Sequence, residues 1–324
     1  MELVTKKTLR LYSGSSHPDL AEEIAGHLGV PLGHANLREF ANGEKHCRFG
    51  ESIRGADVFI IQTHSDPVND AIMEQLIMLD AAKRASAKRI TAVCPYYGYA
   101  RQDRKAEGRE PITAKLVADL MTVAGASRMV SVDLHSGQIQ GFFDKPVDHL
   151  TAMPVLLDYV RRECAGGDVV VVSPDAGRVR VAQRFAQHLG ADLAFIHKRH
   201  VPGKANVVEA SEVIGLVSGR RCLVIDDMID TAGTVVAAGD ILTDFGATEV
   251  WAMATHGLLS DPAIDRLKNS VISRVVVTNT VPLSPDKQFD KIDVLSIAEI
   301  IADAIDAVFE DTSVSEIFDG QNQA

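Results

Sequence analysis

The 324-residue chain has few aromatic residues and few cysteines. Aromatic side chains make up 5% of it, with a single tryptophan, and there are four cysteines. Cys47, Cys94, Cys164 and Cys222 lack the paired spacing of a metal site. Cys94 and Cys222 stand in apolar runs, where a thiol usually serves as a small buried hydrophobic side chain. We therefore expect reduced cysteines and a cytoplasmic protein.

Long apolar runs and a signal-peptide pattern are also lacking. No stretch approaches the roughly 18 apolar residues of a membrane span, and the first residues, Met1–Lys7, are polar. The chain carries 44 acidic and 33 basic side chains, a formal net charge of −11. This balance disfavours nucleic-acid binding but leaves room for a local basic pocket that holds phosphates. We expect neither a membrane nor a nucleic acid as partner.

What the chain does have is the composition of a globular protein. Hydrophobic residues make up 46% and charged residues 24%, which allows a substantial core. Short apolar runs predict strands buried on both faces; they are Val58–Gln62, Ile90–Cys94, Met129–Asp133, Asp168–Ser173, Leu193–Ile196, Cys222–Ile225, Val250–Ala254 and Arg274–Thr278. Between them lie predicted helices at Pro18–Leu28, from Asn69 onward, and at Thr113–Val123, Met153–Arg162, Val179–Leu189, Thr234–Phe245 and Ile297–Val308.

This alternation of strands and helices predicts an α/β fold with parallel sheets and right-handed crossovers. A boundary near residue 150 divides the chain into two α/β halves, residues 8–150 and 151–299. We expect the segment 300–320 to pack back on the first half. Since ligands of such sheets bind beyond the carboxyl ends of the strands, the residues after each strand are where functional side chains are expected.

The strongest functional signal is Arg220–Thr234, which reads RRCLVIDDMIDTAGT. Its apolar strand ends in Asp226 and Asp227, and adjacent carboxylates at a strand end can accept hydrogen bonds from a vicinal diol. Small residues and hydroxyls follow, where backbone N–H groups and a helix N-terminus can hold a phosphate; they are Asp230, Thr231, Ala232, Gly233 and Thr234. The structural alternative is an ordinary capped helix after a strand.

A second signal is the basic segment Tyr96–Leu116, YYGYARQDRKAEGREPITAKL. Four cations stand within nine residues of an otherwise acidic protein: Arg101, Arg104, Lys105 and Arg109. Such a loop after a strand is suited to close over a polyphosphate. A charge run of this kind is otherwise a solvated surface loop.

Further motifs accompany these two, in the order FANGE (Phe40–Glu44), DLHS (Asp133–Ser136), GFFDKPV (Gly141–Val147) and SPDAG (Ser173–Gly177). From about residue 9 to residue 318 the chain resembles the class I ribose-phosphate diphosphokinases. The resemblance implies two type I phosphoribosyltransferase-like (Rossmann-like) domains with parallel sheets flanked by helices. It also implies transfer of the β,γ-diphosphate of ATP to the 1-hydroxyl of ribose 5-phosphate. The products that the resemblance implies are phosphoribosyl diphosphate and AMP. The first of these is used in nucleotide, histidine and tryptophan biosynthesis.

The resemblance also assigns roles to residues. It implies ATP binding by Asn42, Gly43, Glu44, Arg101 and Gln102, and catalysis by Lys198 together with Arg101, Arg104, Lys105 and Arg109. It implies Mg²⁺ binding by His135 and Asp175, since oxygen ligands and a triphosphate suit this ion. Ribose 5-phosphate is expected at His200, Asp226, Asp227, Asp230, Thr231, Ala232, Gly233 and Thr234.

Three residues depart from the family pattern. His200 stands where an arginine is usual, Arg178 replaces a small residue, and Glu107 lies where a basic residue is common. Members of the family are typically homohexamers that are activated by phosphate and inhibited by ADP. The positions that resemble this regulatory site are Cys47, Arg48, Arg84 and Ser313–Phe318, although the last segment by itself reads as an ordinary tail.

Two other functions remain open at this point. A phosphoribosyltransferase that consumes phosphoribosyl diphosphate shares the DDMIDTAGT motif but does not need the Arg101–Arg109 loop with His135 and Asp175. A catalytically silent regulatory subunit is expected to show insertions or lost cations around this loop. Here the loop runs without interruption from Tyr99 to Pro111.

Overall fold

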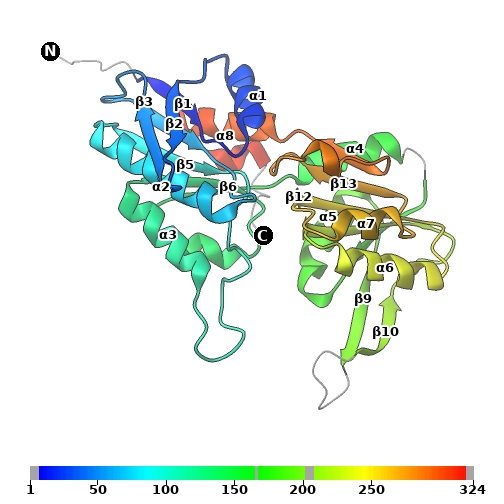
Figure 1. Cartoon of the computed structure of the whole chain (residues 1–324). Helices are drawn as coiled ribbons and strands as arrows, with labels where there is room; N and C mark the ends of the chain where they lie inside the picture. Colours follow the sequence, from blue (N-terminus) through cyan, green and yellow to red (C-terminus); the bar gives the residue numbers. More distant parts are fainter. Residues whose placement is uncertain (1–6, 165–166, 201–207, 319–324) are drawn as a thin grey trace. The chain divides into compact units, whose positions relative to one another are not determined.

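The computed structural model describes residues 7–164, 167–200 and 208–318 (Figure 1), and the side chains of residues 198–211 fall outside the description. The chain divides into two compact units. The first comprises Met1–Thr151, Thr280–Pro282 and Ser296–Ala324, and the second comprises Ala152–Asn279 and Leu283–Leu295. None of the described helices is long and apolar enough to cross a membrane.

The first unit is built on a five-stranded parallel sheet. Across the sheet the strands are β1 (Leu9–Ser13), β4 (Asp57–Ile61), β5 (Arg89–Cys94), β6 (Arg128–Val132) and β7 (Val147–Leu150). The helices of this unit are α1 (Pro18–Leu28), α2 (Val68–Arg84), α3 (Thr113–Ala124) and α8 (Ala298–Glu310), with short 3-10 turns η1 (Gly137–Phe142) and η4 (Val314–Phe318). A small antiparallel sheet, β2 (Ala35–Glu39) and β3 (Lys45–Phe49), contacts α2.

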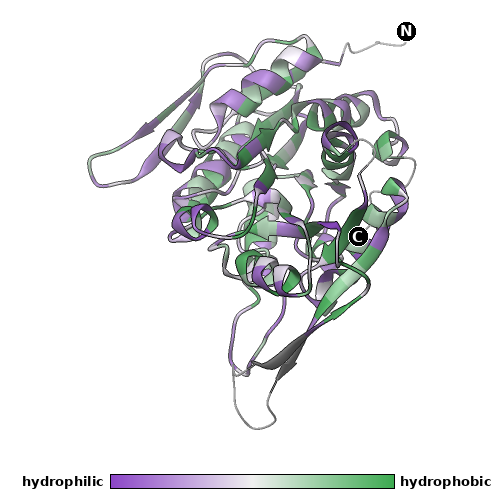
Figure 2. Ribbon diagram, turned by 90° about the vertical axis from the view of Figure 1, so that its right-hand side faces the viewer, coloured by the Kyte–Doolittle hydropathy of each residue, from purple (hydrophilic) through white to green (hydrophobic). Residues whose placement is uncertain are grey.

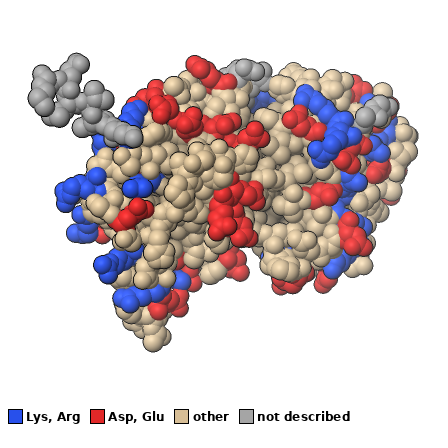
Figure 3. Space-filling view, turned by 90° about the horizontal axis from the view of Figure 1, so that it is seen from above, with Lys and Arg blue, Asp and Glu red and all other residues tan. Residues whose placement is uncertain are grey.

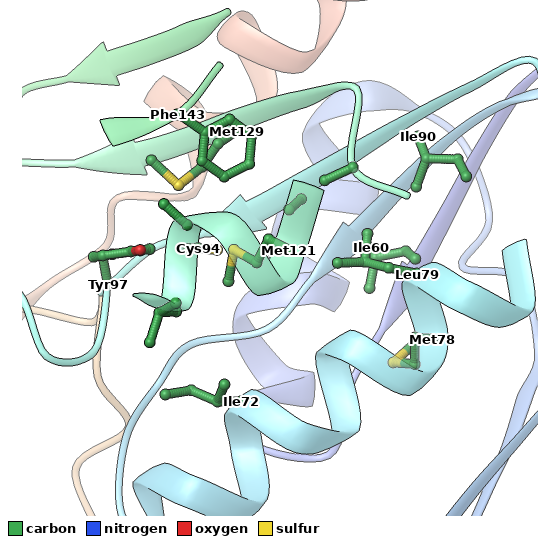
Figure 4. Packing of buried hydrophobic residues seen from close by; sticks show 14 of the residues in the cluster. Ile60, Ile72, Met78, Leu79, Ile90, Cys94, Tyr97, Met121, Met129 and Phe143 are labelled. Carbon is green, nitrogen blue, oxygen red and sulfur yellow. The ribbon is translucent and has the colours of Figure 1, made fainter. Parts of the chain in front are cut away.

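The core of the first unit lies between this sheet and its helices. In Figure 4, Ile60 of β4 lies beside Leu79 of α2, and Met129 of β6 lies near Met121 of α3. These four side chains are fully buried. Because all five residues of β4 are buried, the strand needs an apolar sequence on both faces, as DVFII largely provides.

The second unit is built on a seven-stranded mixed sheet. Its order is β10 (Val208–Ile214), β9 (Asp192–His200), β8 (Val169–Ser173), β11 (Arg221–Ile229), β12 (Glu249–Gly257), β13 (Arg274–Thr278) and β14 (Ile292–Leu295). The helices are α4 (Met153–Glu163), α5 (Val179–Leu189), α6 (Gly233–Asp244) and α7 (Ala263–Lys268), with 3-10 turns η2 (Ala176–Arg178) and η3 (Pro285–Lys287). Figure 2 shows apolar residues concentrated in the strands and polar residues on outward turns of the helices.

The structure confirms the predicted α/β fold and each predicted helix. Cys94 and Cys222 are free thiols buried in the two cores, as expected. One expectation needs correction: the second sheet is not purely parallel, because β10 pairs antiparallel with β9. The sequence analysis also missed β1, β2, β3, β7, β10 and β14. In β2 the sequence ANLRE is half-buried or exposed throughout, so it offers no apolar run to recognise.

Helix α8 follows the second unit in sequence but belongs to the first, where it contacts α1. Arg89, at the start of β5, connects it to the sheet. The guanidinium is 2.5 Å from Asp57 Oδ2 and donates to the carbonyl of Phe309 at 3.2 Å, and it also pairs with Asp311. Asp57 is buried, with 4% of its side chain exposed, and Arg89 is its ion-pair partner.

We predict that Arg89→Leu lowers the free energy of unfolding by about 3 kcal/mol, because it leaves the Asp57 carboxylate buried without its cation. Urea denaturation measures the loss. Lys7→Ala is the matched control, since the pair of Lys7 with Asp311 is exposed to solvent and is expected to contribute much less to stability. Equal effects of the two substitutions would contradict the role assigned to Arg89.

Candidate active site

The loops that leave the carboxyl edge of the first sheet are joined by side-chain hydrogen bonds. Gln62, after β4, accepts from the N–H and the hydroxyl of Ser16 at 3.1 and 2.6 Å. The next residue, Thr63, accepts from the N–H of Tyr96, after β5, at 3.2 Å. Three neighbouring strands thus end in one connected polar edge, in the region where the fold class places ligands.

His64 fixes the backbone just before the basic loop. Its Nδ1 accepts from the N–H of Gly98 at 2.9 Å, so the ring proton lies on Nε2, which contacts Gln75 Oε1 at 2.8 Å. The side chain is fully buried. Burial penalises the charged ring and lowers the pKa of His64 to about 4. A neutral imidazole therefore holds Gly98 in place.

Hydrogen bonds hold the two ends of the basic loop, and its cationic side chains are exposed. The hydroxyl of Tyr97 donates to the carbonyl of Ala114 at 2.8 Å, and Thr113 Oγ1 donates to Gln102 Oε1 at 2.5 Å. Between the residues that make these hydrogen bonds, the chain forms neither helix nor strand. The loop extends from the start of α3 (Figure 1). The four cations are exposed: Arg101, Arg104, Lys105 and Arg109.

Asp103 is the buried residue of this loop, and the sequence analysis did not identify it. Its carboxylate accepts from the hydroxyl of Ser136 at 2.5 Å and from the amide of Gln138 at 2.7 Å. These contacts hold the basic loop against the segment that carries His135. The signal in the sequence is an acid in the middle of a run of cations, which a count of charges overlooks.

His135 itself follows a strained residue. Asp133 has a φ of 37°, a left-handed value that is uncommon outside glycine. The N–H of Leu134 donates to Nε2 of the buried His149 at 2.9 Å. Backbone strain of this kind is often held at functional sites by surrounding contacts.

The predicted ATP residues Asn42, Gly43 and Glu44 form the turn between β2 and β3. Gly43 has a φ of 88°, and the N–H of Glu44 donates to Asn42 Oδ1 at 3.3 Å. All three residues are exposed. They lie in the small antiparallel sheet, whereas Arg101 and Gln102 follow the carboxyl edge of the five-stranded sheet.

In the second unit, the ends of the neighbouring strands β8 and β11 meet through an ion pair. Asp175, after β8, accepts from the N–H groups of Gly177 and Arg178 at 2.8 and 3.2 Å and so caps η2. The Arg178 side chain reaches across to β11. Its Nη2 is 2.7 Å from Asp227 Oδ1, and its Nε is 3.4 Å from Asp226 Oδ1.

The two carboxylates are largely buried, with 15% of the Asp226 side chain and 8% of the Asp227 side chain exposed. Burial and the neighbouring Asp227 raise the pKa of Asp226, and Arg178 acts in the opposite direction. The N–H of Asp227 also donates to Asp226 Oδ1 at 2.8 Å. Asp226 and Asp227 thus offer oxygen atoms that can accept hydrogen bonds, as the motif predicts. Arg178, which contacts them, lies outside this motif.

The rest of the motif forms the entry to α6. The carbonyl of Thr231 accepts from Arg266 at 2.9 Å, and Ala232 is the residue before the helix. Thr231, Gly233 and Thr234 are exposed. Because the first N–H groups of a helix have no partner within it, this turn is suited to an anion. Both signs of charge occur on the face drawn in Figure 3, so the acidic total does not exclude such a site.

Lys198 and His200 lie in β9, the other neighbour of β8. Lys198 pairs in register with Ser211 of β10, beyond the residues of β9 that pair with β8. Their side chains lie outside the described part of the structure. The fold therefore assigns these residues to a strand and gives no contacts for their cationic groups.

The two residues expected to bind metal, His135 and Asp175, belong to different units. Among the described residues, no three His, Cys, Asp or Glu side chains are grouped so as to hold a metal ion. Asp175 is exposed and offers carboxylate oxygen, a ligand that suits Mg²⁺. Mg²⁺ commonly takes only one or two carboxylates and completes its shell with water and phosphate.

Comparison with known proteins decides the family. The N-terminal domain of ribose phosphate pyrophosphokinase matches residues 9–125, and the phosphoribosyl synthetase-associated domain matches residues 200–319. The ribose-phosphate pyrophosphokinase of Streptomyces coelicolor is 56% identical over 316 residues, which cover 98% of each chain. The chain belongs to the ribose-phosphate pyrophosphokinase family.

Two further comparisons support this family assignment. The ribose-phosphate pyrophosphokinase of Mycobacterium tuberculosis is 54% identical over 97% of each chain. The crystal structure of phosphoribosylpyrophosphate synthetase from Mycobacterium smegmatis matches with a TM-score of 0.89 and 53% identity, over 94% of this chain and all of that one. The resemblance inferred from the motifs is confirmed, and so is the fold class.

We predict that His64 makes this pyrophosphokinase family member less stable in mild acid. Between pH 6.5 and 4 the histidine binds a proton in the unfolded protein but not in the folded one. The contribution of neutral His64 to the free energy of unfolding is therefore complete above pH 6.5 and is lost as the pH falls toward 4. The free energy of unfolding should be about 2 kcal/mol lower at pH 5 than at pH 7 because of this group. Urea denaturation of the protein and of His64→Asn measures the difference, and parallel pH dependences would exclude His64 as its cause.

Ala232 has a φ of 60°, which costs free energy for any residue with a Cβ. We predict that Ala232→Gly raises the free energy of unfolding by about 0.5–1 kcal/mol. The control is Ala237→Gly, at an exposed position inside α6, which should lower stability by about 1 kcal/mol. Thermal unfolding measures both, and a loss of stability in Ala232→Gly would contradict the prediction.

Proposed function

We propose that this protein transfers the β,γ-diphosphate of ATP to the 1-hydroxyl of ribose 5-phosphate, which yields phosphoribosyl diphosphate and AMP. The observation that carries the proposal is 56% identity to a ribose-phosphate pyrophosphokinase over 98% of both chains. The site geometry supports it, because the acid pair lies in the carboxyl-terminal half of a parallel strand, and the α6 entry and the basic loop each follow a parallel strand of their unit.

Ribose 5-phosphate binds at the end of β11 in this proposal. The carboxylates of Asp226 and Asp227 accept hydrogen bonds from the ribose 2- and 3-hydroxyls. The 5-phosphate lies at the α6 entry, where Thr231 and Thr234 donate from their hydroxyls and Gly233 lets the backbone approach closely. Asp230 and Ala232 shape the turn, and His200 supplies a further contact from β9.

ATP binds through Asn42, Gly43, Glu44, Arg101 and Gln102. The 1-hydroxyl attacks the β-phosphorus in line, and AMP leaves. Lys198, Arg104, Lys105 and Arg109 surround the transferring group and stabilise its charge, while closure of the loop excludes water. His135 and Asp175 are the residues that would hold Mg²⁺, which would neutralise charge on the phosphates.

The proposal extends to assembly and regulation. The chain self-associates as a homohexamer and works in the cytoplasm, with phosphate and ADP as effectors. The residues that resemble the regulatory site all lie in the first unit: Cys47 and Arg48 in β3, Arg84 at the end of α2, and Ser313–Phe318 around η4. A phosphate titration at saturating substrate tests the regulatory part, since flat activity contradicts it.

The activity is tested by incubating the purified protein with ATP, Mg²⁺ and ribose 5-phosphate and measuring both products. Equal amounts of AMP and phosphoribosyl diphosphate, dependent on both Mg²⁺ and ribose 5-phosphate, support the proposal. A phosphoribosyltransferase forms no AMP under these conditions. Neither product from folded protein in the presence of phosphate would point to a silent regulatory subunit.

We predict that Lys198→Ala lowers turnover at least about a hundredfold, because loss of one cation beside the transferring group typically costs roughly 3 kcal/mol of transition-state stabilisation. Ribose 5-phosphate binding should change little. Lys88→Ala, at an exposed position outside the site, is the control and should keep full turnover. Steady-state kinetics and calorimetry measure the two effects, and a Lys198→Ala protein with near-normal turnover would remove this lysine from the mechanism.

A further inference from the structure

Arg178 lies against the two carboxylates that the proposed function assigns to the ribose diol. Its Nη2 is 2.7 Å from Asp227 Oδ1 and its Nε is 3.4 Å from Asp226 Oδ1. Only 17% of the arginine side chain is exposed. We propose that Arg178 is a positioning residue that orients Asp226 and Asp227 to bind the ribose 2- and 3-hydroxyls, an inference that rests on the proposed function.

The backbone directs Arg178 toward this pair. Asp175 Oδ1 accepts from the N–H groups of Gly177 and Arg178, and the hydroxyl of Ser173 donates to the carbonyl of Asp175 at 2.6 Å. The turn therefore has a fixed shape at the end of β8. Since β8 and β11 are adjacent and parallel, a long side chain at the end of this turn reaches the acids of β11 that lie just beyond its pairing with β8.

The acid pair needs a nearby cation. Burial and the neighbouring Asp227 raise the pKa of Asp226, and Arg178 is the cation that opposes this effect. A guanidinium stays charged at any ordinary pH, and its planar fork contacts both carboxylates at once.

Binding of the diol is compatible with this ion pair. The contacts of Arg178 reach the Oδ1 atoms of the two aspartates. An ionised carboxylate has about four acceptor positions on its two oxygens. The guanidinium can therefore stay in place while hydroxyls bind. The opposite arrangement, in which Arg178 competes with the sugar and must leave, predicts tighter binding when the arginine is removed.

The experiment compares Arg178→Met, which removes the charge at similar length, with Arg178→Lys, which keeps the charge without the fork. Arg180→Met is the matched control, because Arg180 is exposed on α5 two residues away. Calorimetry measures binding of ribose 5-phosphate and of 2-deoxyribose 5-phosphate to the full-length protein, and steady-state kinetics gives kcat and the KM of each substrate.

We expect Arg178→Met to weaken ribose 5-phosphate binding at least about tenfold, as for loss of a charge-assisted contact. The preference for ribose 5-phosphate over its 2-deoxy analogue should fall, because the substitution acts through the diol acceptors. The KM for ATP should stay the same, Arg178→Lys should restore part of the affinity, and Arg180→Met should behave as the unsubstituted protein.

Three results would overturn the inference. Tighter binding in Arg178→Met identifies the arginine as a competitor, and weaker binding with an unchanged preference for the 2-hydroxyl identifies a merely structural role. Absence of ribose 5-phosphate binding in the unsubstituted protein removes its basis. Because calorimetry needs no turnover, a protein that binds ribose 5-phosphate and forms no AMP would contradict the proposed function while still testing Arg178.

Discussion

The strands of a parallel sheet all end at the same edge, and the chemistry of this protein depends on that constraint. In each unit the residues after neighbouring strands meet at the same edge, however far apart they lie in sequence. In the first unit this joins Ser16, Thr63 and Tyr96 by hydrogen bonds. In the second it brings Arg178, after β8, to Asp226 in the carboxyl-terminal half of β11. Each edge gathers groups that could not assemble locally, because the strands between them are apolar and buried.

Much of the fold could be predicted because its strongest signals are local. Buried strands such as Cys222–Ile225 are continuous apolar runs, and the helix Pro18–Leu28 begins with proline and ends before Gly29 in the left-handed conformation. The antiparallel pairs could not be predicted in this way. The β2–β3 pair is partly exposed and polar, so its pairing comes from hydrogen bonds between the strands and from packing on α2.

The same distinction between local and long-range signals applies to the candidate site. The acid pair and the α6 entry could be predicted because they form one continuous motif, and the cations of the basic loop are a local excess of charge. Asp103, His64 and Arg178 depend on partners that are 33, 34 and 48 or more residues away in sequence. Nothing in their neighbouring residues indicates those partners, and Arg178 appeared in the sequence only as a departure from a family pattern.

The place of α8 in the chain has a consequence for biosynthesis. The first unit is completed by a helix that is translated after the whole of the second unit. The sheet of the first unit is thus translated well before the helix that contacts α1 and the acid that pairs with Arg89. The first unit can therefore be completed only after the second unit has been translated.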